Sequence, residues 1–232
     1  MQERWLFDEL MHAGDEHLDP QYVAGYDHKA GVDPALDLAL LRDLALAEAS
    51  TVVDLGAGTG TFALAAAPLC RRVVAVDVSP AMLTLLRARA EQQGLTNVEI
   101  VHAGFLTYEH GGEPADFVYS RHALHHLPDF WKAVALHRIA AFLKPGGVLR
   151  LRDLIFSCDP PEVERVIEAW LGGAAQRAEE GWTRRELKTH LGTEYSTFSW
   201  LLEDMLDRAG FVVQHVEHDE SMIYSAYTCV KR

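Results

Sequence analysis

Residues 51–60 read Thr-Val-Val-Asp-Leu-Gly-Ala-Gly-Thr-Gly, a run that joins one acidic side chain to three alternating glycines. Glycine accepts a positive φ and leaves no Cβ between the main chain and a ligand. A helical pattern follows from Thr61, and the N-terminus of a helix offers free N–H groups and a positive dipole end to an anionic group. An apolar strand, a glycine turn and a helix therefore predict a cradle for a nucleotide-type cofactor.

The next expected strand, residues 73–77, narrows the choice of cofactor because it also ends in a carboxylate, that of Asp77. In a parallel βαβ unit the two strand ends lie side by side, so Asp77 can accept hydrogen bonds from the ribose hydroxyls of a ligand above the glycine loop. The nicotinamide fingerprint Gly-x-Gly-x-x-Gly fits poorly, because its last glycine would fall on Thr61 or Ala63. An NAD(P)-dependent oxidoreductase on the same sheet stays the alternative enzyme class.

Length and composition indicate one globular α/β domain with additions, since the chain has 232 residues, 49% of them hydrophobic and 24% charged. The formal net charge of −13 argues against a nucleic-acid partner, because phosphate binding normally needs a basic face. Cys70, Cys158 and Cys229 have no Cys-x-x-Cys spacing, which indicates neither a disulfide framework nor a zinc site. This cysteine usage favours a reducing compartment.

The first eleven residues carry charges where a signal peptide would need an apolar run; the charged residues are Glu3, Arg4, Asp8 and Glu9. No stretch elsewhere is long enough to span a membrane. We therefore expect a cytoplasmic protein without a membrane partner.

Apolar strands alternate with helical patterns between residues 50 and 153, which is typical of a mostly parallel sheet with helices on both faces. Ser79 is expected to cap a helix that ends at Gly94. Further strands are expected at 97–102, 115–120 and 148–153, a helix at 130–143 and a turn at 144–147. A helix from about residue 198 to 209 and two strands, 211–216 and 223–231, are expected to close the chain.

We expect a single domain over residues 1–232, made of an N-terminal helical cover (1–49), a cofactor-binding core (50–153), a helical insertion (154–196) and a C-terminal helix with the last two strands (197–232). The N-terminal cover is expected to be irregular from about Asp19 to Pro34. The insertion is expected to hold one helix that ends at 172–173 and a short helix within 174–194. Ligands bind over the strand ends of open α/β sheets, so these covers are expected to select the second substrate.

The pairing of Asp54, the glycine run and Asp77 resembles a class I S-adenosylmethionine (SAM) dependent methyltransferase of the small-molecule type. The resemblance extends to 115–120, 123–129, 143–147 and 209–211, and to Tyr26-Asp27-His28-Lys29-Ala30. It implies a Rossmann-like, doubly wound, seven-stranded sheet of order 3-2-1-4-5-7-6, with strand 7 antiparallel, under helical cover segments. It also implies SAM as cofactor, transfer of its methyl group to a small-molecule acceptor, and S-adenosylhomocysteine (SAH) as product.

The resemblance also implies which residues bind the cofactor. Gly56, Ala57 and Gly58 would face the methionyl part of SAM, Asp54 would help to hold its amino group, Asp77 would bind the ribose and Met82 would lie against the adenine. The other residues implied in cofactor binding are Tyr26, Gly60, Val78, Gly104, Phe105, Leu106, Ser120 and Arg121.

The pair Gly104-Phe105 departs from the family pattern, in which Gly-Asp often follows strand three and the carboxylate bonds the adenine amino group. Backbone groups near Phe105 and Leu106 and apolar stacking are therefore expected to hold the adenine. We expect poor discrimination against an adenine analogue that lacks the exocyclic amine.

The loop after the fourth strand holds His122, His125 and His126, and histidine can remove a proton near neutral pH. All three are candidate catalytic residues, with His125 preferred and Tyr22 a more distant candidate; a structural role for the loop is the alternative. No carboxylate or cysteine lies at ligand spacing in this stretch, so we predict no metal. The acceptor pocket is expected between Tyr22, this loop and Trp170.

Three tryptophans at helical positions, Trp170, Trp182 and Trp200, are expected to be core residues more than acceptor platforms. Fold alone does not identify the acceptor or the methylated atom. A non-catalytic SAM-binding protein is a further alternative, because binding and turnover use the same cradle. A homodimer is compatible with the sequence.

Overall fold

The computed structural model describes residues 5–232, apart from the side chains of residues 15 and 16. Glu3 and Arg4, two of the charged residues that argue against a signal peptide, lie outside it. The strands are β1 (Thr51–Leu55), β2 (Arg72–Asp77), β3 (Val98–His102), β4 (Ala115–Arg121), β5 (Leu143–Phe156), β6 (Thr197–Phe198), β7 (Phe211–His218) and β8 (Tyr224–Lys231).

Within residues 5–232, eight α-helices and four short 3-10 helices precede or connect these strands. The α-helices are α1 (Pro20–Ala30), α2 (Ala35–Asp43), α3 (Thr61–Ala66), α4 (Pro80–Gln92), α5 (Asp129–Phe142), α6 (Val163–Gly172), α7 (Arg184–Thr193) and α8 (Ser199–Arg208). The 3-10 helices are η1 (Asp15–Leu18), η2 (Ala67–Leu69), η3 (Leu124–His126) and η4 (Pro160–Glu162).

The sheet has the order β3-β2-β1-β4-β5-β8-β7, with β8 antiparallel to both of its neighbours. This confirms the Rossmann-like order expected from the resemblance, in which β7 and β8 are strands six and seven. The two-residue strand β6 is an addition that pairs with the end of β5 outside the main path. The parallel register sets Asp54 beside Ala75 and Asp77 beside His102, so the carboxyl ends of the central strands form one edge.

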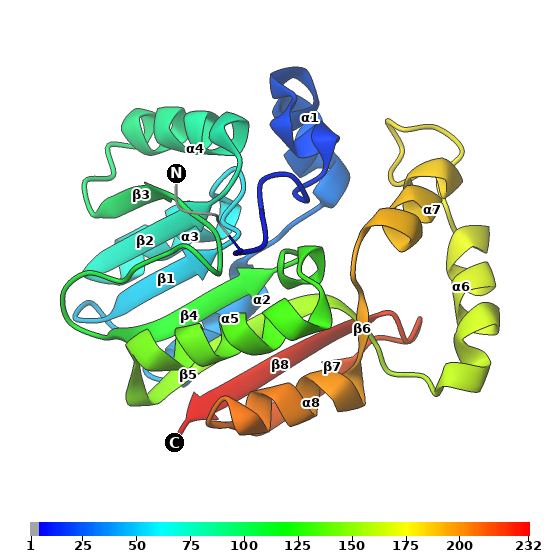
Figure 1. Ribbon diagram of the computed structural model, residues 1–232. Helices are drawn as coiled ribbons and strands as arrows, with labels where there is room; N and C mark the ends of the chain where they lie inside the picture. Colours follow the sequence, from blue (N-terminus) through cyan, green and yellow to red (C-terminus); the bar gives the residue numbers. More distant parts are fainter. Residues whose placement is uncertain (1–4) are drawn as a thin grey trace.

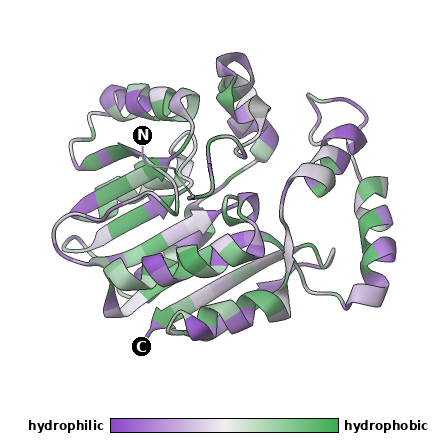
Figure 2. Ribbon diagram, viewed as in Figure 1, coloured by the Kyte–Doolittle hydropathy of each residue, from purple (hydrophilic) through white to green (hydrophobic). Residues whose placement is uncertain are grey.

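Helices cover both faces of the sheet (Figure 1). Leu136 and Ile139 of α5 pack with Leu202 and Leu206 of α8 in one apolar cluster. Side chains from α2, α3 and α4 form the cluster on the other face, among them Leu41, Phe62 and Leu86. The central strands are apolar along most of their length (Figure 2), as expected for strands buried on both faces.

Two helical covers extend beyond the carboxyl ends of the strands: α1 with η1 from the N-terminal part, and α6 with α7 from the insertion (Figure 1). Residues 19–34 are not irregular as expected, because most of them form α1. The Asp19 carboxylate caps α1 by accepting a hydrogen bond from Gln21 N at 2.9 Å, Pro20 takes the first turn, and Gly31 ends the helix at φ 55°.

Strand β5 also differs from the sequence prediction, since it begins at Leu143 and continues to Phe156. The expected turn at Lys144–Gly147 is an irregularity inside this strand: Ala115 pairs with Leu143, whereas Phe117 already pairs with Val148. Gly146 accommodates the extra residues with φ 76°. The short helix expected in the charged stretch 174–194 is α7. Within residues 5–232, no helix combines the length and the apolar character that crossing a membrane requires.

Candidate functional site

The glycine loop between β1 and α3 approaches its neighbours closely. A Cβ on Gly56 would lie 2.2 Å from the Ala123 Cβ, so this position requires glycine for packing as well as for its φ of 74°. A Cβ on Gly58 would meet no atom nearer than the Met82 Sδ at 4.0 Å, because the space above Gly58 is the cavity itself. The bare backbone of Gly58 is therefore open to a ligand.

The Asp77 carboxylate holds the glycine loop and the start of α4 together. Its Oδ2 accepts a hydrogen bond from the Gly58 N–H at 2.8 Å and its Oδ1 accepts one from the Ser79 N–H at 2.8 Å. Burial raises the pKa of Asp77 above its ordinary value, although these backbone N–H groups oppose the rise. Each oxygen keeps a further lone pair, and Asp77 lines the cavity where a ligand with hydroxyl groups would lie.

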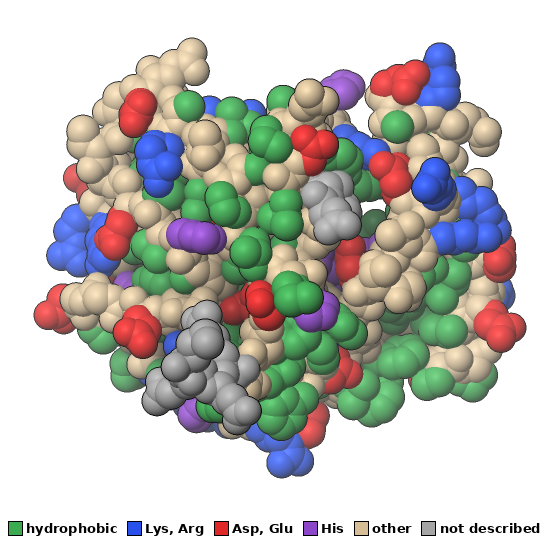
Figure 3. Space-filling view, turned by 45° about the horizontal axis from the view of Figure 1, so that its top comes forward, with side chains coloured by type: hydrophobic (Ala, Val, Ile, Leu, Met, Phe, Trp, Pro, Cys, Tyr) green, Lys and Arg blue, Asp and Glu red, His purple; other side chains and the backbone are tan. Residues whose placement is uncertain are grey.

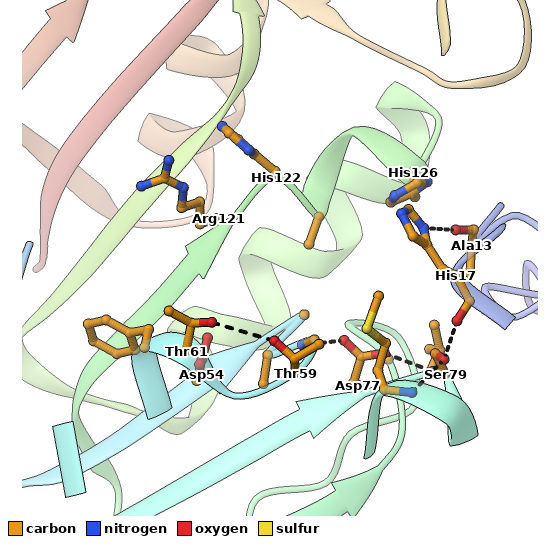
Figure 4. A pocket seen from close by; sticks show the side chains of 18 of the residues that line it. Ala13, His17, Asp54, Thr59, Thr61, Asp77, Ser79, Arg121, His122 and His126 are labelled. Carbon is orange, nitrogen blue, oxygen red and sulfur yellow. Dashed lines mark hydrogen bonds between the residues drawn. The ribbon is translucent and has the colours of Figure 1, made fainter. Parts of the chain in front are cut away.

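Asp54 is a buried carboxylate at the floor of the same cavity (Figure 4). Its Oδ2 has no hydrogen-bond partner among the described residues, and the same is true of Ser120 Oγ and Arg121 Nε. Burial raises the pKa of Asp54 to about 8, and the charge of Asp77 adds to the increase. A buried carboxylate without a partner is costly, and Arg121 is partly buried with its Nε unpaired. A carboxylate and a guanidinium beside one cavity fit a ligand that brings both an ammonium and a carboxylate group.

The N-terminal cover is tied to this cavity by polar contacts. Thr59 Oγ1 donates a hydrogen bond to Asp27 of α1 at 2.5 Å, and the same carboxylate forms an ion pair with Arg89 of α4 at 2.5 Å. Ser79 Oγ donates to the His17 carbonyl at 2.6 Å while also accepting from the Met82 N–H, which caps α4. The N-terminal cover, the glycine loop and the start of α4 are thus joined along one side of the cavity.

Glu9 brings a carboxylate to the end of the cavity where Gly104-Phe105 leaves none. A Cβ on Gly104 would lie 2.4 Å from the Glu9 carboxylate, and Glu9 Oε2 accepts a hydrogen bond from the Leu106 N–H at 3.0 Å. Glu9 is 8% exposed, and burial raises its pKa to about 7. Glu9, Phe105 and Met82 line one cavity, so a carboxylate lies beside residues that were expected to contact the adenine. Adenine binding by backbone groups and apolar contacts stays a prediction.

Most of the residues predicted to bind the cofactor line this cavity. They are Tyr26, Asp54, Gly56, Ala57, Gly58, Asp77, Val78, Met82, Gly104, Phe105 and Arg121. Gly60, Leu106 and Ser120 lie outside the lining: a Cβ on Gly60 would clash with Leu86, and the Leu106 N–H is taken by Glu9. From the N-terminal cover, sequence reasoning named only Tyr26 for this cavity and missed Glu9, Ala13, His17, Asp27 and Val32 as cofactor-binding candidates.

A second cavity of about 790 Å³ adjoins the first one, between α1, the histidine loop and the α6–α7 cover. Tyr22, His125 and Trp170 line it, which places a cavity where the acceptor pocket was expected. Trp182 also lines it, and both tryptophans are only partly buried. Trp170 packs against a small apolar cluster and also borders the cavity. The insertion helices extend past the sheet, and their inner faces border a cavity. Trp200 is not a core residue, because it lies on the surface and is 53% exposed.

The histidines of the loop after β4 occupy different places. His122 has φ 49° and lines both cavities, as does His126. Burial lowers the pKa of each of these two histidines to about 3, so both are neutral. Arg121, the last residue of β4, also lines both cavities, and Figure 4 shows it beside His122.

His125 lies behind these two histidines, with a carboxylate at each ring nitrogen. Asp153 Oδ1 lies 2.5 Å from Nδ1, and Glu194 Oε2 lies 3.0 Å from Nε2. Burial alone would lower the pKa of His125, but the two carboxylates outweigh it and raise the pKa to about 9. This geometry differs from what was expected of a base, because both nitrogens are engaged and the residue lines only the second cavity. Sequence reasoning missed Glu194, which is distant in the chain.

Comparison with known proteins shows which family the chain resembles. A family model described as a methyltransferase domain matches residues 52–147, which hold the glycine loop, Asp77 and the histidine loop. Uncharacterized methyltransferases are similar over nearly the whole chain. One from Bacillus mycoides is 27% identical over 90% of this chain and 89% of its own length, and one from Geobacillus is 28% identical over 83% and 84%.

The chain is a class I SAM-dependent methyltransferase. Its cofactor is SAM, and the nicotinamide alternative is not favoured. The fold of this methyltransferase is similar to that of magnesium protoporphyrin IX methyltransferase from Synechocystis, solved with bound SAH, with a TM-score of 0.67, 14% identity and coverage of 97% of this chain and 100% of the other. A SAM-dependent methyltransferase from Clostridium acetobutylicum has a TM-score of 0.69 at 12% identity, over 91% of this chain and 98% of the other.

Proposed function

We propose that this methyltransferase transfers the SAM methyl group to a small-molecule acceptor bound in the second cavity. The observation that carries the proposal is that the two cavities share part of their walls. His17, Tyr26, Arg121, His122 and His126 line both of them. A cofactor in the first cavity and an acceptor in the second would therefore meet across this shared wall, which is the requirement for direct transfer.

The size and lining of the second cavity favour a small acceptor over a macromolecule. Its volume of about 790 Å³ falls within the range that holds a drug-sized molecule. Aromatic side chains and charges of both signs line it, including Trp170, Lys29 and Glu186. On the face drawn in Figure 3, Lys and Arg side chains are interspersed with Asp and Glu instead of gathering into one basic surface. A nucleic-acid substrate would require such a surface.

The residues of the first cavity offer a partner for each part of SAM, and we assign them on that basis. Asp54 would accept hydrogen bonds from the ammonium group, and Arg121 would face the carboxylate. Asp77 would accept those of the ribose hydroxyls. Glu9 would accept one from the adenine amino group, with Met82 against the ring. Bound SAM supplies an electrophilic methyl group on a sulfonium centre.

In this assignment the protein contributes mainly alignment and the exclusion of water. Tyr26 and His17 would close the shared wall from the N-terminal cover, while His122 and His126 would close it from the loop after β4. Both histidines are neutral, so either can accept a hydrogen bond from an acceptor hydroxyl or amine. We further infer that residues 1–49, 50–153, 154–196 and 197–232 act as one domain, because the covers complete both cavities.

The test is transfer of label from methyl-labelled SAM to a bacterial extract separated into small-molecule and macromolecular fractions. Label in the small-molecule fraction supports the proposal, and label confined to protein or nucleic acid refutes it. Ala30→Phe should fill part of the second cavity and lower transfer at least about tenfold, while SAH affinity stays within about threefold. Ala88→Phe, the same change on the exposed side of α4, is the matched control and should retain transfer.

A further inference from the structure

We propose that His125, His190 and Glu194 form a binding site for one divalent transition-metal ion, with Zn²⁺ as the ion that best matches the donors. The donor atoms of these three residues all lie within 4.8 Å of one another. They come from η3, from the last turn of α7 and from the residue that follows α7. The fold thus brings together two imidazoles and one carboxylate from segments that are distant in the sequence.

The outer hydrogen bonds leave one nitrogen of each imidazole directed at the common point. His125 Nδ1 lies 2.5 Å from Asp153 Oδ1, so Nε2 is the nitrogen that faces Glu194. His190 Nε2 lies 3.2 Å from Ser196 Oγ, so Nδ1 is the nitrogen that faces Glu194. Metal-binding histidines characteristically fix their second ring nitrogen in this way, with a carboxylate as one of the usual partners.

Glu194 is the residue that a cation would satisfy. Its Oε2 lies 3.0 Å from His125 Nε2 and in contact with His190 Nδ1, yet within residues 5–232 it makes no hydrogen bond of acceptable geometry. A single proton can join only two of these three donor atoms. A metal ion between them would accept a lone pair from all three, which is the stronger solution for a buried carboxylate.

The donor set determines the class of the ion. Two imidazole nitrogens and one carboxylate oxygen suit Zn²⁺ and neighbouring transition metals, whereas Mg²⁺ and Ca²⁺ prefer oxygen donors. Three protein ligands leave a tetrahedral ion with one open position, as in catalytic zinc sites.

All three ligands line the second cavity, so a molecule bound there could take the open position. This last step rests on the proposed function: the acceptor would then be a molecule with a hydroxyl or thiol group, whose pKa a bound metal ion would lower. The sequence predicts no metal, because no carboxylate lies at ligand spacing near the histidine loop. Glu194 reaches this loop only in the folded chain, so the proposal reverses that prediction.

The experiment uses the full chain after treatment with a chelator and follows the visible absorption of added Co²⁺, then its displacement by Zn²⁺. The wild type should bind one equivalent of Co²⁺ with a spectrum typical of tetrahedral coordination and should release it to Zn²⁺. His190→Ala and Glu194→Gln should each weaken Zn²⁺ binding by about 100-fold or more, and Ser196→Ala by about tenfold. His137→Ala, on the exposed side of α5, is the matched histidine control and should bind as the wild type does.

Binding that is equal in the wild type, His190→Ala and Glu194→Gln would mean adventitious metal only and would overturn the proposal, as would no binding at all. SAH affinity within about threefold of wild type confirms that each variant is folded, because these ligands lie outside the cofactor cavity. The two proposals fail separately. Label transfer to small molecules without metal binding would refute only the metal site. Specific metal binding with label solely on macromolecules would refute only the small-molecule acceptor.

Discussion

The proposed hydrogen bond between the Glu9 carboxylate and the adenine amino group of the cofactor can be tested directly. We predict that Glu9→Gln weakens SAH binding, because the amide turns an NH₂ group toward the cavity or toward the Leu106 N–H, and either orientation loses an acceptor. A hydrogen bond to a charged group is worth about 1.5–3 kcal/mol, which corresponds to roughly 10- to 150-fold in affinity. Glu9 is 8% exposed, so little solvent screening reduces this value.

The assay is calorimetric titration of wild type and Glu9→Gln with SAH and with an analogue that lacks the adenine amino group. The wild type should lose about tenfold or more with the analogue, whereas the variant should bind the two ligands with similar affinity. This cycle separates recognition of the amine from any disturbance of the Leu106 contact, which affects both ligands alike. If the wild type bound SAH and the analogue equally well, Glu9 would not accept a hydrogen bond from the adenine amino group.

The pH dependence supplies a second readout of the same group. Burial raises the pKa of Glu9 to about 7, so below that pH the carboxyl group is largely protonated and is a weaker acceptor. SAH affinity of the wild type should therefore rise as the pH increases from 6 to 8, and Glu9→Gln should remove this part of the dependence. The sign is opposite for folding of the unliganded protein, because a carboxyl pKa raised from 4.5 to about 7 means that stability falls as the pH rises from about 4.5 to about 7.

Three further predictions concern other residues of the two cavities. Asp77→Ala should weaken SAM and SAH alike by roughly 1.5–3 kcal/mol in calorimetry, and unchanged affinity would refute its place at the ribose. Burial raises the pKa of Asp54 to about 8, so stability of the unliganded protein should fall from about pH 4 to pH 8. Asp54→Asn should raise the free energy of unfolding in urea at pH 9 by about 1–3 kcal/mol while weakening SAM binding, and a loss of stability there would contradict an unpaired charge. His126→Ala should retain SAH affinity within about threefold and lower methyl transfer by about 100-fold if it accepts the proton of the acceptor, whereas normal transfer would leave the loop a structural role.

The part of the site that could be predicted is the part encoded in adjacent residues. Asp54, the three glycines and Asp77 are separated by one helix, and the parallel register of β1 and β2 brings their ends together whatever surrounds them. The mostly parallel sheet follows from the alternation of strands and helices, whereas the order of its strands was implied only by the family resemblance. Helix α1 was missed because Gly25 and several polar residues interrupt its apolar pattern, and only the Asp19-Pro20 cap marks where it begins.

The unpredicted part depends on contacts between distant residues. Glu9 meets the Leu106 N–H across 97 positions, and nothing in the charged stretch around Glu9 distinguishes it from a solvent-exposed residue. Glu194 reaches His125 from the end of α7, in a segment whose charged sequence predicts only a surface helix. Such contacts form only when the N-terminal cover or the insertion packs against the core, so the local spacing of apolar residues cannot predict them.

The N-terminal cover connects the two cavities physically. Glu9 and Asp27 face only the cofactor cavity, whereas His17 and Tyr26 line both cavities. The hydrogen bonds from Thr59 to Asp27 and from Ser79 to the His17 carbonyl fix this segment against the glycine loop and against α4. In the proposed assignment, a cofactor that contacts Glu9 and Asp54 would therefore stabilise the same segment that forms a wall of the second cavity. Binding energy gained at the adenine and methionine ends of SAM would then help to position the wall against which we propose the acceptor binds, which is how remote contacts of a substrate assist the reacting centre.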